Sequence, residues 1–210
     1  VENAVREIAL RLAACPGLNV DVYGQGTAPW FETTTLAPGL TAVGAPEFCS
    51  RFDGNAVLAL ANCLYALLVR RPRVLLLFAS GPSLLAILAR LLRVKVIAAL
   101  RAIDSQRDKW GWLSTRVLRL GEFSALQVAD ACTVNSLEMF RYYDGAARGL
   151  IYIPNGASAA SAGSDAVLER LGLQPDGYLL FAARLDPVKR LHLLLQAYAR
   201  HSPPQPFAAL

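Results

Sequence analysis

The sequence predicts an α/β protein whose parallel sheet is covered by helices on both faces, and three observations lead to this class. Short apolar runs of strand length alternate with segments whose apolar residues recur at helical spacing. The run Val74–Phe78 is apolar throughout, which is typical of a parallel strand buried on both faces. The composition, 54% hydrophobic and 18% charged over 210 residues, allows a substantial core.

The elements of the first half follow from periodicity and from turn residues. Apolar residues at helical spacing predict a first helix from about residue 4 to residue 13, which Gly17 follows as a stop. The expected order is then a strand at 19–23, a turn-rich stretch at 24–53 with a short strand near 40–43, a helix at 56–69, a strand at 74–78, and a helix that opens at Pro82 or Ser83 and runs through Leu92.

The second half continues the same alternation. The expected order is a strand at 94–100, a charged loop at 101–111, a long helix at about 112–129, a strand at 131–134, a short helix capped by Asn135 or Ser136, and a strand at 150–153 that ends in Pro154-Asn155-Gly156. Repeated strand–helix units of this kind imply a Rossmann-like, doubly wound parallel sheet.

A change in composition divides the chain. Residues 157–164 are small and linker-like, and a new helix–strand–helix unit follows at 165–171, 178–183 and 188–199. One such unit cannot bury both faces of a sheet. We therefore expect a nearly complete Rossmann-like domain over 1–156, without its first strand, a linker over 157–164, and the beginning of a second Rossmann-like domain over 165–210.

Charge and cysteine usage narrow the function classes. The formal net charge of +5 favours anionic partners such as nucleotide phosphates or an acidic membrane surface. No basic run is interleaved with aromatic residues, so we expect no nucleic-acid partner. The four cysteines are scattered, and Cys15, Cys63 and Cys132 have apolar surroundings, which predicts buried free thiols in a reducing, cytoplasmic compartment.

Two apolar stretches raise the question of a membrane. The stretch 74–89 is interrupted by Ser80-Gly81-Pro82, and 56–69 is too short to span a bilayer, yet a hairpin anchor over 56–92 stays an alternative. Five arginines close to these helices suggest loose contact with an acidic membrane surface, and ordinary surface helix ends are the competing interpretation. They are Arg70, Arg71, Arg73, Arg90 and Arg93.

Two cations flank a strand-to-helix turn near the C-terminal end. Arg184 closes the apolar run 178–183, and Lys189 opens the next helix. Both side chains can project into the crevice at the carboxyl end of the strand, where open α/β sheets bind ligands, and a helix N-terminus adds N–H donors. This arrangement suits a pyrophosphate. The alternative is an exposed pair flanking a turn, with Asp186 pairing one of them.

Five segments in the same order resemble the family 4 retaining glycosyltransferases, which have two Rossmann-like domains facing a cleft (the GT-B architecture), and most closely their rhamnosyltransferase-like branch. The segments are Val1-Glu2, which resembles the end of a Gly-Gly-x-Glu motif, the loop 104–111, Gly121-Glu122, Ile153-Pro154-Asn155-Gly156, and the run 184–189. The chain departs from the branch in having Arg101-Ala102 where His-Gly is usual, and Arg190 where Gly usually follows the lysine.

The resemblance implies transfer of a sugar from a nucleotide-diphosphate donor to a glycan or lipid-linked acceptor. Arg184 and Lys189 would stabilise the departing diphosphate in place of a metal, so we expect neither a metal nor another cofactor. The substrate-binding residues would be Glu2, Asp104, Gln106, Arg107, Lys109, Glu122, Asn155 and Gly156. The enzyme would act in the cytoplasm or peripherally at the inner face of the plasma membrane, and the chain by itself would be nearly inactive.

Simpler interpretations stay open for these residues. The loop that carries Arg107 and Lys109 could be a solvated charged loop, and Glu122 could make a structural bond to a loop N–H or to a nearby arginine. Asn155-Gly156 could be a turn at a domain edge, and Glu2 could interact with the helix dipole. A non-catalytic Rossmann-like binding or scaffold domain and a small membrane-anchored protein are the alternative functions. The lack of a third glycine after Gly24-Gln25-Gly26 argues against a nicotinamide dehydrogenase.

Overall fold

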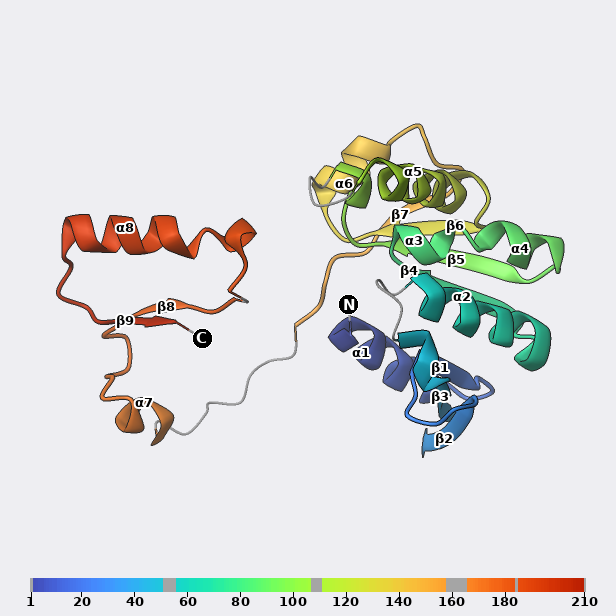
Figure 1. Ribbon diagram of the computed structural model, residues 1–210, viewed down its shortest axis with the longest axis horizontal. Helices are drawn as coiled ribbons and strands as arrows, with labels where there is room; N and C mark the ends of the chain where they lie inside the picture. Colours follow the sequence, from blue (N-terminus) through green and yellow to red (C-terminus); the bar gives the residue numbers. More distant parts are fainter. Residues whose placement is uncertain (1, 51–55, 107–110, 158–165, 184, 210) are drawn as a thin grey trace. The chain divides into compact units, whose positions relative to one another are not determined.

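The computed structural model describes residues 2–50, 56–106, 111–157, 166–183 and 185–209. The chain divides into two compact units, unit 1 over residues 1–156 and unit 2 over residues 157–210. Figure 1 labels the helices and strands of both units. Each unit is mixed α/β, and each is described by itself.

Unit 1 contains a small sheet of three strands, in the order β1-β3-β2. Strand β1 (Val20–Gln25) runs parallel to β3 (Leu40–Ala45), and β2 (Glu32–Ala37) runs antiparallel to β3. Helix α1 (Glu2–Ala13) packs against β1 and β3. The sequence interpretation was wrong about β2, which lies in a stretch expected to be turns. Its three consecutive threonines favour a strand, and Gly39 supplies the left-handed φ of +75° that its tight turn to β3 requires.

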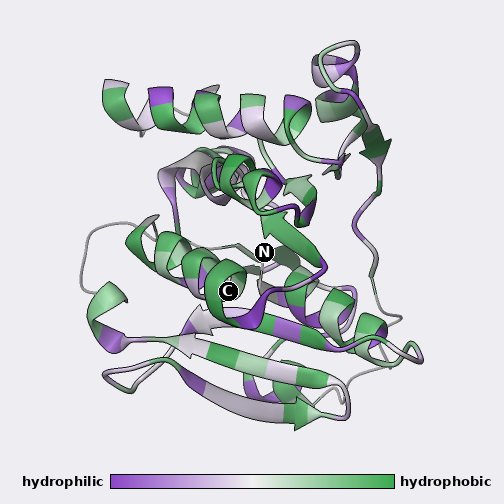
Figure 2. Cartoon of the chain, turned by 90° about the vertical axis from the view of Figure 1, so that its right-hand side faces the viewer, coloured by the Kyte–Doolittle hydropathy of each residue, from purple (hydrophilic) through white to green (hydrophobic). Residues whose placement is uncertain are grey.

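The larger sheet of unit 1 is entirely parallel, in the order β4-β5-β6-β7. Its strands are β4 (Val74–Phe78), β5 (Lys95–Leu100), β6 (Ala131–Val134) and β7 (Leu150–Tyr152). This four-stranded parallel sheet, flanked by helices, is compatible with the expected Rossmann-like class. Hydrophobic residues fill much of the strands and helices of unit 1 (Figure 2).

Helices connect these strands. Helix α2 (Ala56–Tyr65) continues as a π-helical segment, Ala66–Arg70, before β4. Helices α3 (Ser80–Ser83) and α4 (Ala86–Leu91) lie between β4 and β5. Helix α5 (Trp112–Gln127) connects β5 to β6, and α6 (Leu137–Tyr143) lies between β6 and β7. The single helix expected from Pro82 or Ser83 to Leu92 is thus two shorter helices. Ser136 caps α6, because its side-chain oxygen accepts a hydrogen bond from the Met139 N–H at 3.1 Å.

The core of unit 1 lies against one face of the parallel sheet. The strand residues buried on that face are Leu75, Leu77, Val96, Ala98, Leu100, Cys132 and Val134, which occupy matching register positions. Val74, in contrast, is about half exposed. Leu76 and Phe78 alternate with the buried Leu75 and Leu77 and are half-buried, so the second face of β4 is covered only in part.

Gly121 allows an unusually close helix contact in unit 1. A Cβ atom at this position would lie 1.9 Å from the carbonyl oxygen of Ser80, so any other residue would collide with the backbone of α3. Ser80, Ser83 and Ser124 at the same contact are completely buried. Small side chains thus bring α3 and α5 together nearly backbone to backbone.

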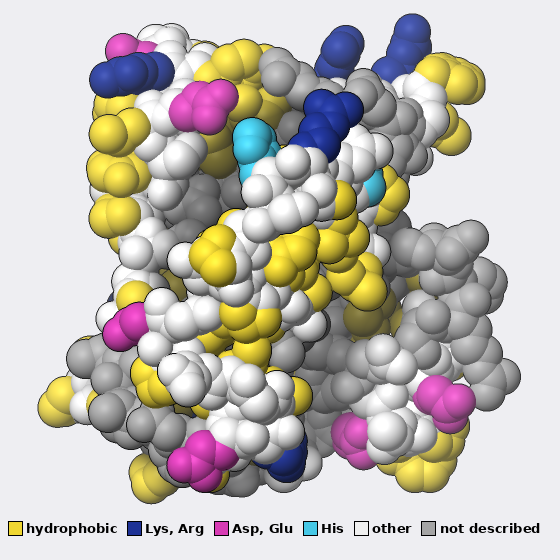
Figure 3. Space-filling view, turned by 90° about the vertical axis from the view of Figure 1, so that its left-hand side faces the viewer, with side chains coloured by type: hydrophobic (Ala, Val, Ile, Leu, Met, Phe, Trp, Pro, Cys, Tyr) yellow, Lys and Arg dark blue, Asp and Glu magenta, His cyan; other side chains and the backbone are white. Residues whose placement is uncertain are grey.

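Unit 2 contains α7 (Ala166–Arg170), β8 (Leu179–Phe181), α8 (Leu191–His201) and β9 (Phe207–Ala209). Strands β8 and β9 are parallel and are joined through α8. The sequence interpretation missed β9, because the prolines just before it suggested an irregular end. No described residue of unit 2 is buried, and apolar side chains of this unit lie on the surface (Figure 3).

The structure bears on two of the sequence expectations, the burial of the cysteines and the possibility of a membrane-spanning helix. Cys49, Cys63 and Cys132 are buried and all four thiols are free, but Cys15 is exposed, contrary to expectation. Cys15 lies two residues after the end of α1 and so outside the helix that packs against β1 and β3. Within the described ranges, no helix is both long enough and apolar enough to cross a bilayer.

Candidate functional site

Four parallel strands end at the same side of unit 1, and we call the residues that follow them the carboxyl edge. Ser80 follows β4, Arg101 and Asp104 follow β5, and Asn155 follows β7. This is the edge at which open α/β sheets bind ligands. The carboxyl edge is therefore the first place to look for a site.

Arg101 connects three strand ends at this edge. Its guanidinium lies 5.5 Å from the centroid of the Phe78 ring, at the end of β4, and its Nη1 donates a hydrogen bond to Asn155 Oδ1. Its buried Nε has no hydrogen-bond partner in the described part of the chain. The sequence treated Arg101 only as a departure from a family pattern and missed it as a site residue. A cation directly after a buried strand, the feature that drew attention to Arg184, could have identified it.

Asp104 opens a 3₁₀ turn, Asp104–Gln106, just after β5. Its Oδ2 accepts a hydrogen bond of 3.3 Å from the Ser80 hydroxyl. The residue before that serine, Ala79, has a φ of +76° and a ψ of 166°, a conformation that non-glycine residues rarely adopt. Backbone strain of this kind is concentrated at active sites and ligand sites.

Glu122 is a buried carboxylate on α5, with 7% of its surface exposed. Its Oε1 accepts a hydrogen bond of 3.1 Å from the Ser105 N–H, and its Oε2 accepts one of 2.9 Å from the Ser105 hydroxyl. This is the bond to a loop N–H that the sequence left open as the structural alternative. The two bonds hold the loop after β5 onto the helix, and each oxygen keeps a further lone pair.

A groove between α5 and α6 extends from Glu122. It encloses about 510 Å³ and is lined by Ser105, Arg119, Glu122, Phe123, Leu126, Gln127, Tyr142, Tyr143 and Ala146. The Tyr143 hydroxyl is buried there without a well-aligned hydrogen bond to any described group. Burial, and then the nearby Glu122 charge, raise the pKa of Tyr143. A carboxylate, a phenol and a guanidinium between exposed aromatic rings would suit a neutral ring that carries several hydroxyls.

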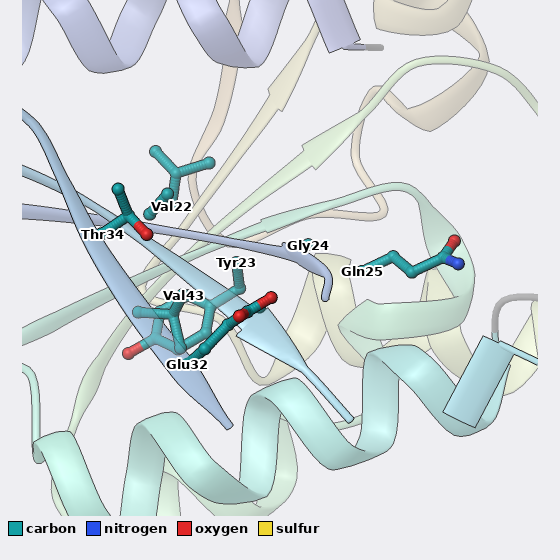
Figure 4. A pocket seen from close by; sticks show the side chains of 9 residues that line it. Val22, Tyr23, Gly24, Gln25, Glu32, Thr34 and Val43 are labelled. Carbon is teal, nitrogen blue, oxygen red and sulfur yellow. The ribbon is translucent and has the colours of Figure 1, made fainter. Parts of the chain in front are cut away.

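A second, smaller hollow lies on the small sheet, with a volume of about 220 Å³. Tyr23 on β1 and Glu32 on β2, the two strands that flank β3, point into it, and Gln25 extends away from them (Figure 4). Glu32 Oε1 already accepts a hydrogen bond of 3.0 Å from the Thr27 N–H. The remaining walls are aliphatic side chains, one threonine and glycine backbone, which makes this hollow the weaker candidate.

In unit 2, Lys189 closes a 3₁₀ turn, Pro187–Lys189, between β8 and α8. Its N–H donates a hydrogen bond of 2.8 Å to the Asp186 carbonyl, and the residue is exposed. Arg190, the N-cap of α8, has a left-handed φ of +59°. Glycine would adopt this conformation at a lower cost than arginine does.

The remaining predicted site residues are only partly described or not described at all. Arg107, Lys109 and Arg184 lie outside the described residues. The backbones of Glu2, at the start of α1, and of Gln106 are described, but their side chains are not. Gly156 is exposed, with open space where a Cβ would be.

The structure thus brings only some of the predicted residues close to one another. It joins Asp104 to β4 through Ser80 and Asn155 to β5 through Arg101, and it sets Glu122 beneath the same loop. The sequence did not indicate Ser80, Ser105 or Tyr143, since a lone serine or tyrosine carries no distinctive spacing. Within the described ranges, no group of three or more His, Cys, Asp or Glu side chains could hold a metal ion.

Comparisons with known proteins add no assignment: no model of a protein family matches the chain, and no curated protein matches it significantly.

Proposed function

We propose that the chain is part of a retaining, GT-B-type glycosyltransferase, with unit 1 on the acceptor side and unit 2 contributing to the donor site. The observation that carries this proposal is the carboxyl edge of the parallel sheet, where Ser80, Arg101, Asp104 and Asn155 converge in bonded pairs. A parallel pair of strands in unit 2, with an exposed lysine between β8 and α8, adds support.

The reaction would exchange one bond at the anomeric carbon of the donor for another. The bond to the phosphate oxygen breaks, a bond to an acceptor hydroxyl oxygen forms on the same face, and the proton of that hydroxyl passes to the departing phosphate oxygen. Negative charge develops on the departing diphosphate. Lys189, together with Arg184, would stabilise that charge as fixed cations, and no metal would be needed.

Unit 1 would bind the acceptor, a glycan or a lipid-linked sugar. Asp104 would accept a hydrogen bond from a sugar hydroxyl at the carboxyl edge. The groove beside Glu122 would accommodate an acceptor ring, with Phe123 and Tyr142 against its C–H face. Glu2, Gln106, Arg107, Lys109 and Gly156 complete the proposed binding residues.

One observation favours a non-catalytic binding domain instead. In the resembling branch, a histidine near the reacting sugar occupies the position of Arg101, and here the guanidinium is bonded to Asn155. Such a domain would bind nucleotide sugars or glycans without transferring a sugar. Release of nucleoside diphosphate from a nucleotide sugar in the presence of an acceptor, followed by phosphorus NMR, distinguishes the two.

The donor-site assignment can be tested by binding. Titration of the whole chain with UDP, GDP and dTDP should reveal weak, saturable binding to at least one of them. Lys189→Ala should weaken that binding about tenfold, because a charge-assisted hydrogen bond to phosphate is lost. Isothermal titration calorimetry or ligand-observed NMR supplies the measurement.

Arg200→Ala is the matched control, since it removes one exposed cation from α8 of the same unit. It should change the dissociation constant less than twofold. Equal losses in the two variants would reduce the effect to net charge and overturn the role of Lys189. Absence of binding to all three nucleotides at 10 mM, a concentration roughly tenfold above a millimolar dissociation constant, would overturn the donor site.

A further inference from the structure

The amino ends of β4 and β5 lie at the side of unit 1 opposite to the carboxyl edge. Helix α4 and the π-helical extension of α2 end on this same side (Figure 1). We call residues 68–74 and 90–95 the basic-apolar rim. The two segments are neighbours, because the Lys95 N–H donates a hydrogen bond of 3.2 Å to the Arg73 carbonyl and Val74 pairs with Lys95 in the sheet.

Large apolar side chains are exposed on both segments of the rim. They are Leu68, Val69 and Val74 on the first segment, and Leu91 and Leu92 on the second. Leu91 is 75% exposed, more than most leucines of the chain. Single exposed leucines are ordinary, but a group of five apolar residues around two adjacent turns indicates a surface that contacts something apolar.

The same rim carries surplus positive charge. Arg70 and Lys95 are paired with Asp21 and Asp130, at 2.9 Å and 2.8 Å. The other arginines are exposed, and for Arg71, Arg73 and Arg93 no ion pair is formed with any described residue. Arg71 Nε contacts only a backbone carbonyl, that of Leu68.

Two of the rim arginines have an unusual backbone conformation. Arg71 and Arg93 have φ values of +50° and +58°, the left-handed conformation at the ends of helical segments where glycine or asparagine is preferred. Arginine at both positions therefore carries a conformational cost that glycine would avoid. The same conformation occurs at Arg190 and Ser202, at the two ends of α8, so the left-handed backbone alone does not mark an anion site; at the rim it lies beside exposed arginines and leucines.

We propose that the basic-apolar rim is a docking surface for a membrane that contains anionic lipids. The arginines would meet the lipid headgroups, and the leucines and valines would enter the boundary between headgroups and acyl chains. A nucleic acid would use the arginines but leave the apolar side chains without a partner. The proposal does not depend on the proposed transferase activity, and a chain bound in this way would leave its carboxyl edge facing water.

Sedimentation with sucrose-loaded vesicles tests the surface. The whole chain should bind vesicles of 70% phosphatidylcholine and 30% phosphatidylglycerol, with much weaker binding to pure phosphatidylcholine and to the mixed vesicles at 0.5 M salt. The double variant Arg71→Gly/Arg93→Gly should lose about 30-fold in partition coefficient, since each surface arginine contributes about fivefold. Both substitutions relieve left-handed backbone, so misfolding is not expected to explain the loss.

Arg190→Gly is the matched control, because it also replaces a left-handed arginine with glycine, but in unit 2. It should bind as the unchanged chain does. Equal binding to neutral and anionic vesicles, an equal loss in Arg190→Gly, or an unaltered double variant would each overturn the proposal. So would a single-stranded RNA that binds the chain as tightly as the anionic vesicles do, since a plain polyanion site would then suffice.

Discussion

Units 1 and 2 are both built from parallel strands joined by helices, yet only unit 1 has buried residues among those described. In unit 1, helices flank the four-stranded sheet, and side chains such as Leu100 and Val134 are completely enclosed. In unit 2, α8 presents Leu193, Leu194 and Leu195 at the surface. The comparison teaches that an amphipathic pattern specifies a helix or strand locally, while a core also requires a second layer for the apolar face to pack against.

The largest expected difference between the units comes from truncating one leucine in each. Leu100→Ala should lower the free energy of unfolding by about 3 kcal/mol, because it opens a cavity in the packed core of unit 1. Leu194→Ala should cost less than about 1 kcal/mol, because that side chain is already 42% exposed. Urea unfolding followed by circular dichroism measures both, and similar losses would show that unit 2 is packed after all.

A second test concerns the close contact between α3 and α5. Gly121→Ala should destabilise unit 1 by about 2 kcal/mol, because its Cβ would collide with the Ser80 carbonyl. Gly24→Ala is the control, since a Cβ there meets nothing within 4 Å. Thermal unfolding distinguishes the two variants. Equal melting temperatures would mean that the helices separate at little cost.

The smallest effect is a dependence on alkaline pH that arises in the core of unit 1. Burial raises the pKa of the Cys63 and Cys132 thiols to about 11, from an ordinary value of 9.0. A raised pKa gives stability that is complete below pH 9 and is lost as the pH rises towards 11. Between pH 8 and pH 9 the loss should stay below about 1 kcal/mol.

Urea unfolding at several pH values measures this slope. Replacing both buried thiols, Cys63→Ala/Cys132→Ala, should reduce it. Replacing the exposed thiol, Cys15→Ala, should leave it unchanged. A slope that survives the double substitution would assign the alkaline loss to other groups, such as Tyr23, whose pKa burial raises to about 12.

Periodicity predicted the parallel strands of unit 1 closely, because apolar runs such as 74–78 allow little else. It failed where local patterns were weak. The threonines of β2 are polar, and prolines obscured β9. The sequence also could not show that β4 is an edge strand, since strand order depends on contacts between distant residues.

The sequence indicated some residues of the candidate site but not which residues bond to one another. Asp104 was recognisable because it lies in a charged loop that follows a strand, and Glu122 because a carboxylate on an apolar helix is unusual. Their partners Ser80 and Ser105 were not recognisable, because serines are common and are brought there only by folding. Arg101 was visible as an anomaly, and only the structure revealed that it contacts both Phe78 and Asn155.

The hydrogen bond between Arg101 and Asn155 also fixes the last residues of unit 1. Asn155 lies two residues before the point at which unit 2 begins, and the guanidinium of Arg101 fastens it to the end of β5, across the intervening strand β6. Residue 155, at the end of unit 1, is therefore held in place by one charge-assisted hydrogen bond. An anion arriving at the carboxyl edge would compete with Asn155 for the same guanidinium, so anion binding there and the hold on residue 155 would depend on one side chain.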